Sequence, residues 1–301
     1  MSDLRDRVRQ LVQWPSGPVA THAVDVCAVP AEGMRREEVW LEGHPRTRAT
    51  VLLPPGDGPF PTILYCHGHG DDFDLGRREV LEGARWLDRP LGAEMVRLGF
   101  AVVAADALGF GADRDRDWTE TMSAKSLMWW GQGLFAETLQ QLAEVLGYAL
   151  SRPDVDRARV YTFGVSTGAA QAWWLAALDD RAAGTAHGCM LADMERLIAD
   201  GSHDHHGIHL IVPGLLRVCD MGHVAGLVAP RPQFVAAAES DPMTPDAARR
   251  AAHGRLTHAY RAAPDRLWIH VEPGDGHRLT TGMADAALAF LARTASEGRP
   301  T

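Results

Sequence analysis

The feature that most limits what this chain can fold into is a regular alternation of short apolar segments with amphipathic ones, which begins near residue 61. Segments that are apolar on both faces, such as Ala101–Ala105, are typical of strands inside a parallel sheet. The segment Phe135–Ala149 instead carries apolar residues at spacings of three and four, which predicts one buried helix face. Strands that alternate with helices favour a mostly parallel sheet with helices on both faces, so we predict the α/β class.

The first 55 residues follow a different pattern. Their short segments of alternating polarity predict an antiparallel entry to the sheet: Val19–Ala28, Arg36–Leu41 and Ala49–Leu53. The later strands are expected at Pro61–Cys66, Ala101–Ala105, Val160–Phe163, Gly188–Leu191, Phe234–Ala238 and Leu267–Val271. Because no repeat or linker interrupts the chain, we expect residues 1–301 to form a single domain, with 193–216 as a lid or pocket insertion. The stretches at about 71–90, 112–130 and 193–216 are expected to be irregular.

Composition argues against several kinds of partner. The 301 residues contain 39 acidic and 30 basic side chains, and this net charge of −9 disfavours nucleic acid and anionic membranes. No apolar run approaches the ~18 residues that span a bilayer, and the charged N-terminus does not resemble a signal peptide. The four cysteines are far apart, which favours free thiols. We expect a cytoplasmic protein without nucleic-acid or membrane partners, for which a homodimer is one possibility.

A candidate nucleophile lies in Gly164-Val-Ser-Thr-Gly168, directly between a predicted strand and a predicted helix. A nucleophile on such a sharp turn needs small residues two positions before and after it, because larger side chains would collide with the flanking elements. The N-terminus of the following helix can also stabilise negative charge. We therefore predict Ser166 as the nucleophile. The alternative is an ordinary glycine-rich turn in which the serine caps a helix.

A serine hydroxyl needs a base to become nucleophilic, and His277 is the best placed of the fourteen histidines. It lies in a loop just after the last predicted strand, at the sheet edge where active sites collect. In contrast, His253 and His258 lie in a predicted helix and His270 lies inside a strand. His277 is therefore the predicted base.

The imidazole in turn needs a carboxylate that fixes its tautomer and tolerates its positive charge. Asp241 follows the predicted strand Phe234–Ala238 and completes the order serine, acid, histidine that is typical of nucleophiles on such a turn. We predict Asp241 as the acid. Asp193 and Glu239 remain alternative candidates for the acid. The non-catalytic alternative for Asp241 is an aspartate that stabilises a turn or caps the following helix.

Attack of the serine on a carbonyl creates an oxyanion, which backbone N–H groups usually hold. One donor is expected from Thr167, next to the nucleophile, and the other from the loop His67–Gly70. Within that loop we favour the N–H of His69, with Gly68 as the alternative, since glycines let the main chain approach a substrate closely. The imidazoles of this loop could ligate a metal, but holding the loop in shape is the favoured interpretation.

Two further patterns are candidates for the substrate pocket. The stretch 202–209 holds four histidines and an aspartate, which are suitable metal ligands in type, but no spacing fixes a coordination geometry. We predict no metal there and favour a loop near the pocket, with His206 in its wall and plain solvated surface as the alternative. Trp129 and Trp130 could line an apolar part of the pocket.

Several further motifs run over most of the chain, namely His67–Gly70, Gly99–Asp106 with Gly109–Gly111, Arg152–Asp156, Pro213–Leu216 with Asp220, and Leu227–Pro232. On these motifs, the sequence resembles the dienelactone-hydrolase-like and acetyl-xylan-esterase-like branch of the α/β-hydrolases. The resemblance implies an α/β-hydrolase fold and esterase-type hydrolysis of a small-molecule ester with no cofactor. Dienelactone hydrolases proper are expected to use a cysteine nucleophile, and this chain departs from them with Ser166.

The predicted function is that of a serine hydrolase that cleaves a carboxylic ester through an acyl-enzyme. A thioesterase, lactonase, peptidase or carbon–carbon bond hydrolase would use the same three residues. Two alternatives of other classes are a non-catalytic binding protein on the same fold and a metal-dependent hydrolase built on the histidine-rich stretch.

Overall fold

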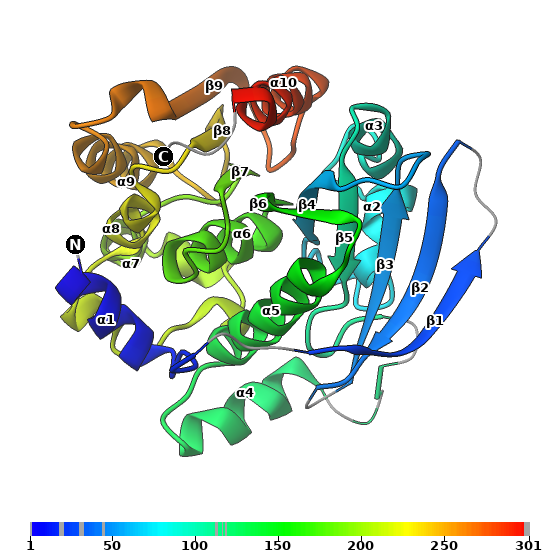
Figure 1. The fold of residues 1–301 in the computed structure, drawn as a ribbon. Coiled ribbons are helices and arrows are strands. Elements are labelled where there is room, and N and C mark those ends of the chain that lie inside the picture. The colour runs from blue at the N-terminus through cyan, green and yellow to red at the C-terminus, as the bar shows by residue number, and fades with distance from the viewer. Residues whose placement is uncertain are drawn as a thin grey trace.

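The fold is centred on one large twisted sheet (Figure 1). The structure is a computed structural model that describes residues 2–17, 21–29, 33–43, 46–111, 114–115, 117 and 119–297. The nine strands found among them are β1 (Ala23–Val29), β2 (Arg35–Leu41), β3 (Thr47–Leu53), β4 (Phe60–Cys66), β5 (Ala101–Ala105), β6 (Val155–Val165), β7 (Gly184–Gly188), β8 (Gln233–Ser240) and β9 (Leu267–Asp275). Their spatial order is β1-β2-β3-β5-β4-β6-β7-β8-β9.

The type of strand pairing changes once across the sheet, at β5. Neighbours from β1 to β5 pair antiparallel, whereas neighbours from β5 to β9 pair parallel. This confirms the predicted α/β sheet, mostly parallel with an antiparallel N-terminal entry. The first predicted strand begins at residue 19, but residues 19 and 20 lie outside the described part, and β1 begins at Ala23.

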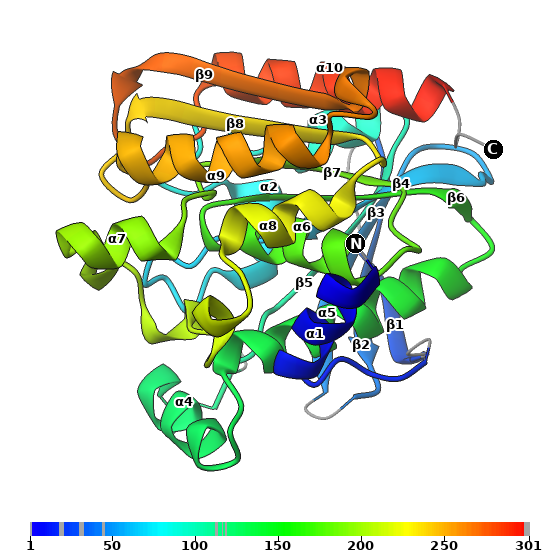
Figure 2. The ribbon, with the colours of Figure 1, turned by 90° about the vertical axis from the view of Figure 1, so that its left-hand side faces the viewer.

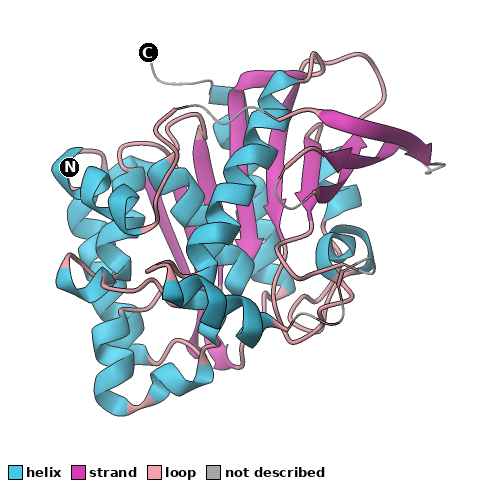
Figure 3. Ribbon diagram, turned by 90° about the horizontal axis from the view of Figure 1, so that it is seen from below, coloured by secondary structure: helices cyan, strands magenta, loops and turns pink. Residues whose placement is uncertain are grey.

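Helices cover both faces of the sheet (Figure 3). One face carries α2, α3 and α10, and the other carries α1, α5, α6, α8 and α9. Two more helices, α4 and α7, lie toward the periphery (Figure 2). Their bounds are α1 Ser2–Leu11, α2 Glu79–Glu82, α3 Gly92–Arg97, α4 Glu120–Trp129, α5 Leu134–Ser151, α6 Thr167–Leu178, α7 Met194–Asp200, α8 Met221–Ala225, α9 Asp246–Ala259 and α10 Thr281–Glu297.

The sheet separates two apolar cores because successive side chains of a strand point to opposite faces. In β4, Ile63 and Tyr65 pack into the core beneath α3 and α10. Their neighbours Leu64 and Cys66 pack against α5 and α6 on the other face. All four side chains are almost completely buried. This burial on both faces is why the central strands are continuous apolar runs in the sequence.

Two elements differ from the sequence-based expectation. Helix α1 was not predicted, because half of its residues are charged; Val8 within it and Val12 just after it nevertheless pack into the core next to α6. The strand expected at Gly188–Leu191 is a wrong prediction, since β7 ends at Gly188. Cys189 has a φ of 65°, in the left-handed region, so the chain leaves the extended conformation there.

The segments 112–130 and 193–216, expected to be irregular, contain the short helices α4 and α7 and several turns of 3-10 helix. Helix α4 projects from the body of the protein (Figures 1 and 2), and Ala124 is its one buried residue. Among the described residues, no single helix is long and apolar enough to cross a membrane. The bent pair Ile208–Arg217 and Met221–Val228, with 89° between its parts, meets that test by length and composition only.

Candidate active site

Ser166 lies on the tight turn that joins β6 to α6. Its backbone has a φ of 60° and a ψ of −127°, a strained conformation for a residue with a side chain. The flanking glycines make this turn possible. A Cβ atom on Gly164 would lie 2.1 Å from the carbonyl oxygen of Gly168, and one on Gly168 would lie 2.1 Å from the carbonyl oxygen of Cys66. The close approach of three main-chain segments thus explains the glycines around the serine.

Three residues predicted to act together lie in hydrogen-bonding contact. Ser166 Oγ is 2.7 Å from Nε2 of His277, and Nδ1 of His277 is 2.8 Å from Oδ2 of Asp241. Each follows the carboxyl end of a different parallel strand, namely β6, β9 and β8. Because those ends share one edge of the sheet, residues far apart in the chain meet there. With Nε2 free of a proton, this chain of contacts can move the proton of a serine hydroxyl.

The structure also distinguishes among the three candidate acids. Asp241 is buried, and its second oxygen accepts the N–H of Met243 at 2.8 Å, which orients the carboxylate toward His277. The carboxylate of Asp193 instead accepts hydrogen bonds from the backbone of Gly222 and the side chain of Arg255. Glu239 is exposed. Asp241 is therefore the carboxylate that contacts the imidazole.

The N–H groups of Thr167 and His69 are available as donors, because neither donates to an acceptor in the described part of the chain. Thr167 begins helix α6, so its N–H is one of the first-turn donors that have no partner within the helix. The alternative prediction, that the N–H of Gly68 is the second oxyanion donor, is wrong. That N–H donates to Oε2 of Glu79 at 2.9 Å and is not free to bind an oxyanion.

Glu79 and Trp86 support the loop His67–Gly70, which follows β4. Glu79 is completely buried and also accepts the hydroxyl of Tyr65 at 2.8 Å. Burial raises the pKa of Glu79 to about 7, against the hydrogen bonds from Tyr65 and Gly68 that lower it. A Cβ atom would lie 2.6 Å from the Trp86 ring if placed on Gly68, and 1.8 Å from it if placed on Gly70. Both glycines are therefore required by the close packing of the loop on this indole.

Both ring nitrogens of His67 are engaged within the protein. Nδ1 donates to the carbonyl of Gly68 at 2.7 Å, and Nε2 accepts the N–H of Ala107 at 2.9 Å. Burial lowers the pKa of His67, which favours the neutral imidazole that these two contacts need. His67 therefore ties two loops together at the carboxyl edge of the sheet.

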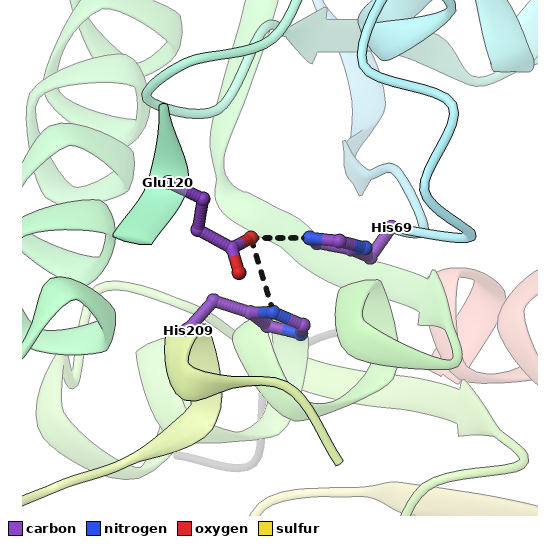
Figure 4. Close-up of side chains that lie close together, drawn as sticks. All are labelled: His69, Glu120 and His209. Carbon is purple, nitrogen blue, oxygen red and sulfur yellow. Dashed lines mark hydrogen bonds and ion pairs between the residues drawn. The ribbon is translucent and has the colours of Figure 1, made fainter. Parts of the chain in front are cut away.

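Beside the serine, His69, Glu120 and His209 form a cluster that we call the imidazole–carboxylate cluster (Figure 4). Nε2 of His69 hydrogen-bonds to Oε2 of Glu120, and Nδ1 of His209 lies 3.2 Å from the same oxygen. On its other side, Nε2 of His209 is 3.1 Å from the hydroxyl of Thr167. The cluster thus reaches both residues whose N–H groups are candidates for the oxyanion hole.

Two imidazoles and a carboxylate are also suitable metal ligands. However, the rings of His69 and His209 are stacked, with centroids 3.9 Å apart and planes inclined by 12°. An imidazole binds a metal through a lone pair in its ring plane, and two nearly parallel stacked planes do not converge on one ion. Nδ1 of His69 also accepts the N–H of Asp71 at 3.1 Å, which leaves the ring proton on Nε2. The arrangement fits hydrogen bonding better than metal coordination.

The cluster carries a fixed negative charge. Burial alone would raise the pKa of Glu120. The imidazoles of His209 and His69 outweigh this effect and lower the pKa to about 2. Burial lowers the pKa of His209. At neutral pH, Glu120 is therefore ionised and His209 is a neutral imidazole.

The candidates for the pocket wall lie elsewhere. The side chains of Trp129 and Trp130 are 91% and 82% exposed at the end of α4, and they do not line the cavities beside the site, which corrects our prediction. His206 donates from Nε2 to the carbonyl of Met243 at 2.8 Å, so it packs on the loop that carries the acid. The histidine-rich stretch does not converge on one point, because His203, Asp204 and His205 are exposed.

A groove of about 1280 Å³ runs beside the cluster, and helix α4 forms one of its walls. Next to it, a small cavity of about 20 Å³ touches Thr167, His69 and His209. Glu120 borders both spaces. The walls of the groove combine aromatic and charged side chains, among them Trp40, Phe73, Phe110, Arg48 and Arg114.

Sequence reasoning missed Glu79 and Glu120. Both lie in segments expected to be irregular, and a single glutamate there has no motif that distinguishes it from a surface residue. His209 lay within the histidine-rich stretch, whose density of imidazoles was the available signal. Glu120 lies 51 positions from His69 and 89 from His209 in the chain, so no local pattern records these contacts.

Comparison with known proteins gives relatives for most of the chain. YtaP of Bacillus subtilis (strain 168), which carries the name of a hydrolase, is 32% identical over 255 residues, covering 83% of this chain and 84% of YtaP. No family model matches the sequence.

Solved structures of esterases share the fold. Acetyl xylan esterase 1 from Thermoanaerobacterium sp. JW/SL YS485 superimposes with a TM-score of 0.64 at 18% identity, covering 97% of this chain and 93% of that one. A glucuronoyl esterase from Solibacter usitatus superimposes with a TM-score of 0.66 at 16% identity, covering 97% and 92%. At such low identity, these likenesses establish the arrangement of strands and helices.

Proposed function

This chain belongs to the α/β-hydrolase superfamily, and from that membership we propose that it is a serine hydrolase that cleaves carboxylic esters. The observation that carries the proposal is the contact chain from Ser166 Oγ through His277 to Asp241, with distances of 2.7 and 2.8 Å. Within the superfamily, the motif Leu227–Pro232 favours the dienelactone-hydrolase-like and acetyl-xylan-esterase-like branch.

In the proposed mechanism, Ser166 Oγ attacks the ester carbonyl while Nε2 of His277 takes the hydroxyl proton. Asp241 stabilises the resulting imidazolium through Nδ1. The alcohol then leaves with the proton from His277, and an acyl group stays on the serine. A water molecule, deprotonated by the same imidazole, attacks the acyl-enzyme and releases the acid, which restores the serine.

The negative oxygen of each tetrahedral intermediate would be held by the N–H groups of Thr167 and His69. Thr167 is the first residue of helix α6, so the helix dipole adds a favourable field at its N–H. These groups are positioned before the reaction starts. They therefore stabilise the developing charge without reorganisation, which is the largest electrostatic contribution expected in such a site.

For the substrate, we propose an ester that is joined to a large polar group such as a sugar. Two proteins of the same fold are named for esters of xylan and glucuronic acid. The groove beside Glu120 also has room for more than a short acyl chain, and it offers aromatic faces and charged groups. Aromatic rings and hydrogen-bonding side chains suit the apolar faces and hydroxyls of a sugar.

The test is hydrolysis of nitrophenyl esters of increasing acyl length, and of acetylated sugars, by the wild type and Ser166→Ala. Ser296→Ala, an exposed serine of α10, is the matched control. We expect activity in the wild type and the control and a loss of about 10³-fold or more in Ser166→Ala. Activity that survives in Ser166→Ala would refute the nucleophile. A wild type that hydrolyses none of these esters would refute the proposed ester specificity.

A further inference from the structure

We propose that Glu120 is a positioning residue of the oxyanion hole, which holds His69 and Thr167 in place through the imidazoles of His69 and His209. This inference rests on the proposed function, because it concerns the same ester hydrolysis. One carboxylate oxygen contacts both imidazoles, and each imidazole leads to one of the two candidate oxyanion donors.

The first branch acts on His69. Its side chain is held at both nitrogens, by Oε2 of Glu120 and by the N–H of Asp71. The rings of Phe73 and Phe110 pack nearly perpendicular to the imidazole, with ring centroids 5.1 and 5.2 Å away, and confine it. The backbone of His69 lies between two glycines, which allow many conformations. Anchoring the imidazole therefore restricts the direction in which the His69 N–H points.

The second branch acts on Thr167. His209 stacks on His69, and its Nε2 lies 3.1 Å from the Thr167 hydroxyl. The same residue offers the other candidate N–H at the start of α6. Nδ1 of His209 is buried and lies 3.2 Å from Glu120, off the line of a hydrogen bond, so this contact is electrostatic. The position of His209, and with it that of Thr167, thus depends on the same carboxylate.

The role of Glu120 is geometric rather than a direct charge effect. A carboxylate near the developing oxyanion would by itself oppose it, since like charges repel. One oxygen of Glu120 accepts the Nε2–H of His69 and lies 3.2 Å from Nδ1 of His209, so the carboxylate acts on the two donor residues through these imidazoles. A neutral amide can also accept a hydrogen bond from His69. We therefore expect Glu120→Gln to keep most of the activity that Glu120→Ala loses.

The experiment measures kcat and KM for nitrophenyl acetate in the wild type, Glu120→Ala and Glu120→Gln. Asp117→Asn, which removes an exposed carboxylate three positions before Glu120, is the matched control for charge. The same proteins are titrated with a trifluoromethyl ketone, which forms a tetrahedral adduct with an active serine. Because the adduct carries an oxyanion, its inhibition constant reports the oxyanion hole directly.

For Glu120→Ala we expect kcat to fall by roughly tenfold to a hundredfold while KM changes less than about twofold, and the inhibition constant to rise by a similar factor. Glu120→Gln and Asp117→Asn should stay within about threefold of the wild type. A Glu120→Ala protein that changes only KM, or that binds the ketone as the wild type does, would overturn the proposal.

Two substitutions of Thr167 keep the proposal testable if Glu120→Ala does not fold. Thr167→Val removes the hydroxyl that contacts His209 but keeps the backbone N–H, and Thr167→Ser keeps both. We expect kcat to fall in the valine variant and to be largely retained in the serine variant; equal kcat values would overturn the proposal. If the wild type hydrolyses no ester, the proposed function fails and this inference fails with it. An active wild type with an unimpaired Glu120→Ala variant refutes this inference alone.

Discussion

Asp241 accepts a hydrogen bond from His277 at 2.8 Å, although 36 residues separate the two in the chain and each follows a different strand. The carboxylate is buried, and the backbone N–H of Met243 holds its other oxygen. This fixed acceptor leaves the proton of His277 on Nδ1 and the lone pair of Nε2 facing Ser166. The orientation of the imidazole therefore depends on Asp241.

Asp241→Asn is expected to lower kcat by about 10³- to 10⁴-fold with little change in KM, because an amide can stabilise the wrong tautomer of the imidazole. Steady-state kinetics with a nitrophenyl ester would measure both constants. Asp265→Asn, an exposed aspartate before β9, is the matched control and should behave as the wild type. A loss smaller than about tenfold in Asp241→Asn would show that another group orients His277.

A second prediction concerns the buried carboxyl of Glu79. Burial raises its pKa from an unfolded value of 4.5 to about 7, so between those pH values the folded protein holds the proton more tightly than the unfolded chain. The resulting stabilisation is fully present below pH 4.5 and is lost as the pH rises through 7. Glu79→Gln removes this titration. The free energy of unfolding of the wild type, minus that of the variant, should fall by on the order of 2 to 3 kcal/mol across this range.

Urea unfolding at several pH values between 4 and 8 would measure that difference. Glu82→Gln is the matched control, because Glu82 belongs to the same helix but is exposed and pairs with Arg78. Its stability should follow the pH dependence of the wild type. Parallel curves for the wild type and Glu79→Gln would contradict the raised pKa.

A third prediction concerns metal removal. Dialysis against EDTA is expected to leave ester hydrolysis unchanged, because the stacked rings of His69 and His209 do not converge on one ion. The hydrolysis rate before and after dialysis, with and without added Zn²⁺, provides the measurement. If activity were lost and Zn²⁺ restored it, the imidazole–carboxylate cluster would be a metal centre and its rings would have to rotate to bind the ion.

A fourth prediction compares two glycine substitutions. Gly70→Ala places a Cβ atom 1.8 Å from the Trp86 ring at a residue whose φ is +51°, so both the packing and the backbone oppose it. We expect a loss of stability of about 2 kcal/mol or more and a strong loss of activity. Gly254→Ala, where nothing lies within 4 Å on helix α9, should instead stabilise the protein by about 0.5 to 1 kcal/mol. Thermal unfolding of both variants would test the pair, and similar melting temperatures would refute this account of the loop.

Sequence reasoning was most successful where the cause is local. The run Ala101–Ala105 is apolar throughout because it is buried on both faces, and it forms strand β5 as predicted. Sequence reasoning failed at α1, because the buried Val8 within the helix and Val12 just after it do not stand out among charged residues. It failed again at Cys189, because the left-handed backbone that ends β7 is not marked by a glycine.

By itself, the sequence determined the alternation of strands and helices and the positions of Ser166, Asp241 and His277 at the ends of three strands. Those features follow from side-chain periodicity and from the steric need for glycine beside a tight turn, and both act over a few residues. Only the tertiary structure decided that Asp241 rather than Asp193 contacts His277 and that the N–H of Gly68 is occupied by Glu79. It also brought Glu120 to His69, 51 residues away. Such contacts depend on how separate loops pack against one another at the edge of the sheet, and no spacing within a single segment encodes that packing.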